Sequence, residues 1–293
     1  MTDSEVSRPD AGDRVLDLEI GPFRLSVATS FGPRVLGLRV ANGPEFFARL
    51  GSHVVIDRPD SGIYRFHGGH RLWASPEVPS ITYAPDDEPC QVETEEDLIS
   101  ITGPVDRAGL TKRIVVSLEA GMLAVDHLLG NGGSSVIEVA PWAITQLRLG
   151  GAALVPTARP EPDGLQASHS LALWSYTDLS DPRLSWRGRA LVVDAVAGPQ
   201  FKIGTGPRPG RLGYLLDRHL FTKEIPSAGP GDYPDRGAVG QLYLNDLFCE
   251  LESVGPLTAL HPGAQVSHRE LWAIEACDDL ETAYWRIVGE GSS

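Results

Sequence analysis

Short stretches in which apolar and polar residues alternate recur along almost the whole chain, and turn-forming residues separate them. Strict alternation places every second side chain on the same face of an extended strand, which is typical of β-structure packed on one face. The 32 glycines and 23 prolines among 293 residues favour many turns and short strands over long helices. The pattern predicts strands at residues 15–20, 23–28, 35–40, 98–102, 111–118, 123–129, 136–140, 191–193, 211–216, 219–224, 240–244, 248–253 and 266–274.

Few other elements interrupt this pattern. Apolar residues have helical spacing at 279–288, and a short helical turn is predicted at 44–50. Strands and helices do not alternate, and neither an internal repeat nor a linker divides the chain. We therefore predict an all-β protein with few short helices, one large sandwich domain at 14–290 and a flexible tail at 1–13. Loops are predicted at 156–164 and 228–237.

The charge and the cysteine content argue against several classes of protein. A formal net charge of −14 repels a phosphate backbone, so we expect no nucleic-acid partner. The three cysteines are too scattered for a disulfide framework and fit a reducing compartment. Residues 1–13 are polar, and no apolar run reaches the roughly 18 residues that span a bilayer. We expect a cytoplasmic monomer or homodimer with no membrane partner.

Residues 66–73 read Phe-His-Gly-Gly-His-Arg-Leu-Trp and form the most distinctive motif of the chain. A Gly-Gly pair permits a tight turn and a close approach of a ligand to the backbone. An indole can cover the C–H face of a ring while charged groups bind its hydroxyls, which predicts a site for a small carbohydrate-like ligand. We expect this site to lie in a loop; the alternative is a tight turn packed beneath the tryptophan. The candidate binding residues are His67, His70, Arg71, Trp73 and, four residues later, Glu77.

Two carboxylates and two histidines are candidates for proton transfer. Glu250 and Glu252 are two apart in a predicted strand, so their side chains share one face. If this face borders a groove, one carboxylate acquires a raised pKa and suits a general base; otherwise both face solvent on an edge strand. His127 is either a core residue or a catalytic group. His268 belongs to a late strand face that either completes the groove or is exposed.

Three cations in Gly- or Pro-rich surroundings, Lys202, Lys223 and Arg236, could bind an acidic group of the ligand or could simply be solvated. Arg236 belongs to the sequence Tyr-Pro-Asp-Arg-Gly, whose rigid turn favours a binding role. Tyr233, at the start of the same turn, is a candidate aromatic wall.

Metal and cofactor motifs are missing from the sequence. His67, His70 and Glu77 could converge on a metal, but neither a His-Glu-x-x-His motif nor a cysteine cluster supports one. No Gly-x-Gly-x-x-Gly or phosphate-binding loop occurs, and Gly-x-Ser-x-Gly is also missing. We predict no metal, no cofactor and no serine hydrolase.

Several of these segments together resemble the galactose mutarotase-like superfamily, which includes the aldose 1-epimerases. Residues 29–38 resemble its opening strand pair, and His67-Gly68-Gly69 resembles the turn that carries a sugar-binding histidine. The resemblance covers roughly residues 15–275 and is closest to a bacterial branch with the pattern Gly-Gly-His-Arg-Leu-Trp. Other matching segments are 125–131, 248–252, 260–263, Pro76-Glu77, Trp142, Thr145 and 233–237.

The resemblance implies a β-supersandwich with a ligand groove on its concave sheet. It implies an isomerase that interconverts the anomers of a free sugar or related cyclic hemiacetal. Such a reaction needs one base and one acid, and we predict Glu252 or Glu250 as the base and His70 as the acid.

One departure from the family pattern leaves other functions open. Aldose 1-epimerases carry a second catalytic histidine where this chain has residues 140–146, which include Trp142 and no histidine. Either His70 or His127 replaces it, or the chain does not run that reaction. The alternatives are a non-catalytic carbohydrate-binding protein, or a lyase, glycosidase or cyclase/isomerase of specialised metabolism on the same scaffold.

Overall fold

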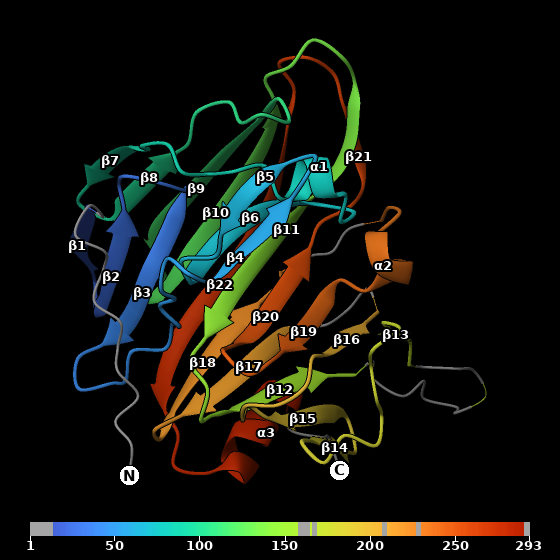
Figure 1. The fold of residues 1–293 in the computed structure, drawn as a ribbon. Helices are drawn as coiled ribbons and strands as arrows, with labels where there is room; N and C mark the ends of the chain where they lie inside the picture. Colours follow the sequence, from blue (N-terminus) through green and yellow to red (C-terminus); the bar gives the residue numbers. More distant parts are fainter. Residues whose placement is uncertain (1–13, 158–164, 166–168, 207–209, 227–229, 290–293) are drawn as a thin grey trace.

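Two ten-stranded antiparallel sheets stack against each other in the computed structural model, which confirms the predicted all-β class (Figure 1). A separate hairpin is formed by β4 (Val55–Arg58) and β5 (Gly62–Arg65). The predicted tail at 1–13 and most of the predicted loop at 156–164 lie outside the described residues. The structure describes residues 14–157, 165, 169–206, 210–226 and 230–289.

The N-terminal strands form one edge of the first sheet. The strand that begins at the Gly-Gly pair lies near the centre of this sheet. An additional short strand, β21 (Thr258–Leu260), pairs with β11. The order across the sheet is β1 (Val15–Ile20), β2 (Phe23–Ala28), β3 (Arg34–Val40), β6 (Gly69–Ser75), β11 (Ile137–Leu147), β20 (Cys249–Val254), β19 (Gly240–Leu244), β16 (Phe201–Thr205) and β13 (Leu171–Leu173).

The second sheet covers one face of the first, and long strands occupy its centre (Figure 1). Its order is β14 (Leu184–Arg187), β15 (Ala190–Asp194), β12 (Ala152–Pro156), β17 (Arg211–Leu216), β18 (His219–Glu224), β22 (Gln265–Ala276), β10 (Met122–Asn131), β9 (Leu110–Glu119), β8 (Leu98–Thr102) and β7 (Gln91–Glu95).

The hydrophobic core fills the space between the two sheets. Leu251 of the first sheet and Val125 of the second are fully buried in the same cluster. Phe47, Phe221 and Trp272 form its aromatic centre, with the Phe47 and Trp272 ring centroids 5.9 Å apart. Since side chains alternate along a strand, every central strand of the first sheet presents one set of residues to this core and the other set to the opposite face.

The Gly-Gly pair leads directly into β6, so the predicted loop site lies largely in a buried strand. Gly68 and Gly69 have positive φ values of 88° and 72°. A Cβ atom on Gly68 would lie 2.0 Å from the carbonyl oxygen of Ala48, and one on Gly69 would lie 2.2 Å from that of Val35. Only glycine allows this conformation and this close approach of neighbouring backbones. The expectation of a loop here was wrong, because the glycines serve a sharp entry into a strand.

The helical elements differ in part from the prediction. The segment 44–50 is extended rather than helical, and isolated bridges pair Phe47 with Leu147 and Arg49 with Gly68. The C-terminal helix is confirmed as α3 (Leu280–Val288), whose N-cap Asp279 accepts from the backbone N–H of Thr282 at 2.8 Å. Within the described ranges, no helix is both long and apolar enough to cross a membrane. The other helices of the described residues are the single turns α1 (Pro79–Thr82) and α2 (Pro234–Gly237).

Candidate functional site

A cavity of about 440 Å³ lies on the face of the first sheet that is turned away from the second sheet. Strands β6, β11, β16, β19 and β20 form its floor, because alternate residues of these strands point into it. The hairpin β4–β5 and the loop after β13 contribute to its walls. The aromatic residues that line it are Phe66, Trp73, Tyr83, Trp142, Trp174, Tyr176, Tyr243 and Phe248.

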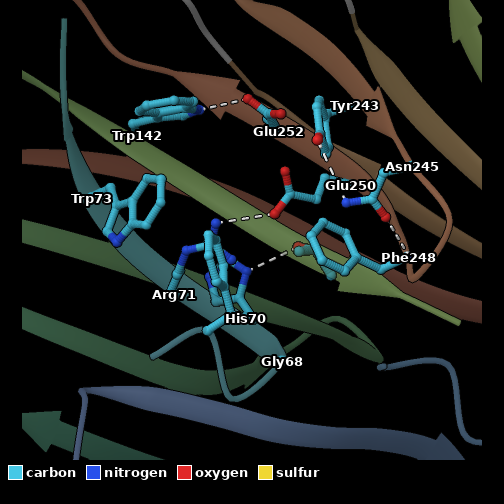
Figure 2. A network of polar contacts seen from close by, with 12 residues as sticks. Gly68, His70, Arg71, Trp73, Trp142, Tyr243, Asn245, Phe248, Glu250 and Glu252 are labelled. Atoms are coloured by element: carbon cyan, nitrogen blue, oxygen red, sulfur yellow. Dashed lines mark hydrogen bonds and ion pairs between the residues drawn. The ribbon is translucent and has the colours of Figure 1, made fainter. Parts of the chain in front are cut away.

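Two buried ion pairs lie on the floor of this cavity, and Figure 2 shows the one between Arg71 and Glu250. Arg71 Nη2 donates to Glu250 Oε1 at 3.0 Å. Lys202 Nζ donates to both carboxylate oxygens of Glu252, at 3.1 and 2.8 Å. The indole N–H of Trp142 also donates to Glu252, at 2.7 Å. Each carboxylate therefore has its own cation, so the floor is polar without a large excess of either charge.

Aromatic rings cover both cations. The guanidinium carbon of Arg71 lies 4.1 Å from the ring centroid of Trp73. The ammonium of Lys202 lies 4.7 Å from the ring centroid of Trp142 and 4.8 Å from that of Trp174. Such cation–π contacts hold a buried cation in place and leave the rest of each indole as a flat apolar surface. These surfaces suit the C–H face of a cyclic ligand.

A larger hollow of about 680 Å³ lies beside β1, β2 and β3. Its lining includes the ion pair of Arg24 and Glu19, whose side chains are 51% and 68% exposed. Exposed pairs of this kind are held only weakly and do not preorganise a site. The aromatic cavity, with its buried pairs, is the stronger candidate.

The two glutamates of β20 have different surroundings. Both oxygens of Glu252 accept hydrogen bonds, and its side chain is fully buried. Glu250 is bound only through Oε1, and none of the described residues donates to its Oε2. Burial raises the pKa of Glu250, Arg71 opposes this shift, and Glu252 adds to it. Glu250 is thus the carboxylate whose pKa and open oxygen suit proton transfer.

The structure brings some of the predicted site residues together and separates others. Arg71, Trp73, Glu77, Trp142, Lys202 and Glu250 line the cavity, and Glu252 lies at its floor. Glu77 accepts a hydrogen bond from the hydroxyl of Tyr83. His67, Tyr233 and Arg236 are outside the lining: His67 stacks on Phe31 with ring centroids 3.8 Å apart, and the other two lie at α2. His70, His127, Lys223 and His268 lie between the sheets.

His70 and Arg71 are separated because they are neighbours in a strand. Consecutive side chains of a strand point to opposite faces, so Arg71 faces the cavity while His70 faces the core. The edge of the His70 ring packs against Trp272 of the second sheet, with centroids 4.6 Å apart. A direct contact of His70 with a ligand in the cavity is therefore not part of this arrangement.

The buried histidines belong to a hydrogen-bonded chain that crosses between the sheets. Lys223 Nζ donates to Thr145 Oγ1 at 3.1 Å, so the Thr145 hydroxyl is left to donate to His70 Nδ1 at 2.9 Å. His70 then carries its proton on Nε2 and donates to His127 Nε2 at 2.7 Å. His127 donates from Nδ1 to the carbonyl oxygen of His268 at 2.9 Å. In this network, both ring nitrogens of His70 and of His127 have hydrogen-bond partners while the rings are neutral.

A second branch ends at Glu270, which is fully buried. Lys223 Nζ lies 3.0 Å from Glu270 Oε1, and the indole N–H of Trp272 donates to Oε2 at 2.8 Å. Ser253 donates to Oε1 and lies 2.6 Å from His268 Nε2. The carboxylate thus has a cation and two further donors, which offsets the cost of its burial. Lys223 also donates to the carbonyl oxygens of Ala143 and Leu251, at 3.2 and 2.9 Å.

His70, His127 and Glu270 each place a ligating atom within 4.8 Å of the others, a spacing that metal sites share. The hydrogen-bond network argues against this use. Three donors already occupy the oxygens of Glu270, and the ammonium of Lys223 already balances its charge. A divalent cation at this position would be repelled by that ammonium. The cluster fits a buried polar network better than a metal centre.

The buried histidines predict that the protein loses stability in mild acid. Burial lowers the pKa of His70 and of His127, and lowers that of His268 to about 3. These side chains stay neutral in the folded protein, while the unfolded chain binds protons below about pH 6.5. Stability is therefore complete above this pH and decreases below it, by up to about 1.4 kcal/mol per pH unit for each histidine.

Urea unfolding between about pH 8 and pH 5 measures this dependence. As a control, replacing the exposed His261 with glutamine should leave the slope unchanged. A free energy of unfolding that is constant over this range would mean that the three buried histidines titrate normally.

Several residues of the cavity were not predicted from the sequence. Tyr243 alternates with Gln241 on β19, so the period of a strand would have placed it on the same face as its cross-strand partner Glu250. Trp174 and Tyr176 follow a strand of only three residues and carry no periodic signal. Aromatic residues in such a loop can be placed only by the tertiary fold.

Solved structures with the same architecture come from two lactobacilli and from Escherichia coli. A galactose mutarotase-like protein from Lactobacillus casei aligns with a TM-score of 0.54 and 14% identity, over 89% of this chain and 100% of its own. A candidate aldose 1-epimerase from E. coli K12 aligns with a TM-score of 0.55 and 13% identity, over 90% and 100%. A galactose mutarotase related enzyme from Lactobacillus acidophilus aligns with a TM-score of 0.53 and 10% identity, over 91% and 99%.

These similarities concern the fold, since identities of 10–14% are too low to carry a shared activity. No protein-family model matches the sequence, and no curated protein matches it. The alignments nevertheless extend over nearly the whole of each chain and agree with the two stacked sheets described above. The chain therefore has the galactose mutarotase-like fold.

Proposed function

We propose that the aromatic cavity binds an uncharged, sugar-like cyclic molecule and that the protein is an isomerase of the aldose 1-epimerase type. The observation that carries this proposal is Glu250, which is buried at the cavity floor with a raised pKa and one open oxygen. Arg71 and Lys202 are both paired with carboxylates, which favours a neutral ligand over an anionic one. The names of the structurally similar proteins are consistent with sugar chemistry.

In this proposal Glu250 is the general base. Its open oxygen removes the proton from the anomeric hydroxyl, and the ring opens as an acid protonates the ring oxygen. Rotation of the resulting carbonyl and closure of the ring then give the other anomer. Trp73, which lines the cavity, packs against the ring, while Arg71 holds the carboxylate in place.

Tyr243 is the proposed acid, in place of His70. It is directly opposite Glu250 in the register of β19 and β20, so the two side chains share the cavity face. Burial raises the pKa of the Tyr243 phenol, which keeps it protonated and able to donate at neutral pH. A carboxylate and a phenol on neighbouring strands thus supply the base and the acid that the reaction needs.

Magnetisation-exchange NMR on D-galactose, D-glucose, D-mannose and D-xylose tests the proposal. We expect the purified protein to accelerate anomer exchange of at least one of these sugars above the rate in a non-catalytic buffer. Boiled protein at the same concentration is the control for trace catalysts. Exchange at the buffer rate for all four sugars would contradict the isomerase proposal.

A non-catalytic sugar-binding protein is the second candidate, and one observation favours it. Trp142 occurs where the resemblance leads us to expect a histidine. Trp142 and Lys202 both donate hydrogen bonds to Glu252 and hold its side chain in place. That half of the cavity floor is built for binding and carries no free proton-transfer group. Calorimetric binding of one of the same sugars without any accelerated exchange would select this function.

A further inference from the structure

Gln146 is a buried amide whose side chain forms no hydrogen bond within the described part of the chain. It lies on β11, is fully buried, and neither its Oε1 nor its Nε2 bonds to any described residue. Arg71, also buried, has two further donor atoms, Nε and Nη1, that bond to none of the residues the structure describes. Buried polar groups are nearly always paired, so unpaired atoms in one region call for an explanation.

The strand register places these atoms in one row across the sheet. Gln146 is opposite Gly69 of β6 on one side and Glu250 of β20 on the other. Gly69 has no side chain, and the backbone of Val35 fills the position of its missing Cβ atom, so Gly69 offers Gln146 no side-chain partner. Since Arg71 lies two residues further along β6 and reaches Glu250, its guanidinium crosses the row that contains Gln146.

Aromatic rings close this row off from one side. The guanidinium carbon of Arg71 lies 5.5 Å from the ring centroid of Phe66, and Phe66 packs against Phe248 with centroids 6.2 Å apart. Both rings belong to the cavity lining. Trp142 and Ile144 also line the cavity, and Gln146 follows them by alternation on β11, so the buried row lies just beneath this lining.

The unsatisfied atoms match a pair of neighbouring hydroxyl groups. Arg71 can only donate, Glu250 accepts as a carboxylate, and the amide of Gln146 has one donor atom, Nε2, and one acceptor atom, Oε1. A hydroxyl accepts and donates at once, so two adjacent hydroxyls can satisfy all of these groups. A carboxylate or phosphate would satisfy Arg71 but would be repelled by Glu250.

We propose that Gln146 is a specificity-determining residue that binds a ring hydroxyl of the ligand, beside a hydroxyl held by Arg71. This inference rests on the proposed function, because it assumes that the cavity takes a sugar-like molecule. It assigns to Gln146 a contact with the substrate and no part in proton transfer.

The test compares Gln146→Met with the wild type in two measurements. Methionine keeps the length of the side chain and removes both unsatisfied atoms. We expect the variant to unfold at an equal or higher urea concentration, because a buried unpaired amide destabilises the free protein. We expect its affinity for the best-bound of D-galactose, D-glucose, D-mannose and D-xylose to fall about tenfold, measured by calorimetry.

Monodeoxy analogues of that sugar identify the contact. One analogue should bind the wild type about tenfold more weakly than the parent sugar, and the variant should bind both equally. The matched control is Gln241→Met on β19, because Gln241 Nε2 already donates to Asp235 and Ala238, at 2.8 and 3.1 Å. The control should lose stability and keep its affinity for the sugar.

The outcomes separate this inference from the proposed function. If the wild type accelerates anomer exchange but Gln146→Met binds the sugar as tightly as the wild type, only the proposed role of Gln146 is contradicted. If the variant is also less stable, the amide holds an ordered water instead of a ligand. If the wild type neither binds nor interconverts any of the four sugars, both proposals are overturned.

Discussion

Replacing Lys223 with methionine is expected to destabilise the protein by about 3–5 kcal/mol, the usual cost of breaking a buried ion pair. Lys223 and Glu270 are both fully buried, and their charged atoms lie 3.0 Å apart. Without the ammonium, the donors that remain to Glu270 among the described residues are the neutral Ser253 and Trp272. Thr145 and the carbonyls of Ala143 and Leu251 also lose their shared donor.

Urea unfolding of the variant and of two comparison proteins measures this effect. Arg218→Met removes an exposed pair with Asp278, whose side chains are 75% and 73% exposed, and should cost less than about 1 kcal/mol. The double variant Lys223→Met with Glu270→Gln should recover part of the loss, because no buried charge is then left unpaired. A single Lys223 variant as stable as the wild type would mean that the pair is not ionised.

The network around Lys223 and the cavity share the same three strands. On β6, β11 and β20, the residues His70, Thr145 and Ser253 face the core. The residues next to them in sequence, Arg71, Ile144 and Glu252, face the cavity or its floor. The ammonium of Lys223 fixes two of these strands through their carbonyls. The buried network therefore supports the floor on which the ion pairs stand.

Much of the fold followed from the period of two and from the turn residues. The pattern identified the N-terminal hairpin of β1 and β2 because apolar and polar residues alternate in it, as in β2, whose apolar positions are buried. It also put Glu250 and Glu252 on one face, as the structure has them. The resemblance then indicated how the strands assemble, which alternation alone cannot do.

The strand β6 was missed for a physical reason. All seven of its residues are buried, and its sequence Gly-His-Arg-Leu-Trp-Ala-Ser shows no alternation of apolar and polar residues. The glycines at its start are typical of a loop, and the cation Arg71 and the neutral His70 are buried only because partners elsewhere in the chain pair with them. Had this segment been recognised as a strand, alternation would have placed His70 and Arg71 on opposite faces.

The burial of Lys223 and its pairing with Glu270 could not be predicted from the sequence either. Its neighbours Thr222 and Glu224 give no sign that the side chain points into the core. Its partner Glu270 is 47 residues away and comes close only through the pairing of β18 with β22. A lysine in a short polar strand is normally solvated, so only the register of the sheet reveals a buried one.

Replacing Glu250 with glutamine is expected to reduce anomer exchange by about 10²–10⁴-fold, the usual contribution of a general base. Glutamine has nearly the same shape and can still accept from Arg71, but it cannot take a proton at neutral pH. Sugar affinity should change far less than the rate. Exchange NMR for the rate and calorimetry for the affinity, on the same sugar, separate the two effects.

Glu252→Gln is the matched comparison, since the two residues share a strand and a face. It leaves Lys202 without a counter-charge. It should therefore lower the sugar affinity and the free energy of unfolding more than it lowers the rate of anomer exchange of the bound sugar. The wild-type rate should fall with decreasing pH as Glu250 takes up a proton, at a pH above the usual range near 4.3 because burial raises its pKa. If Glu252→Gln abolishes exchange and Glu250→Gln does not, Glu252 is the base. If neither variant slows exchange, proton transfer does not depend on this pair.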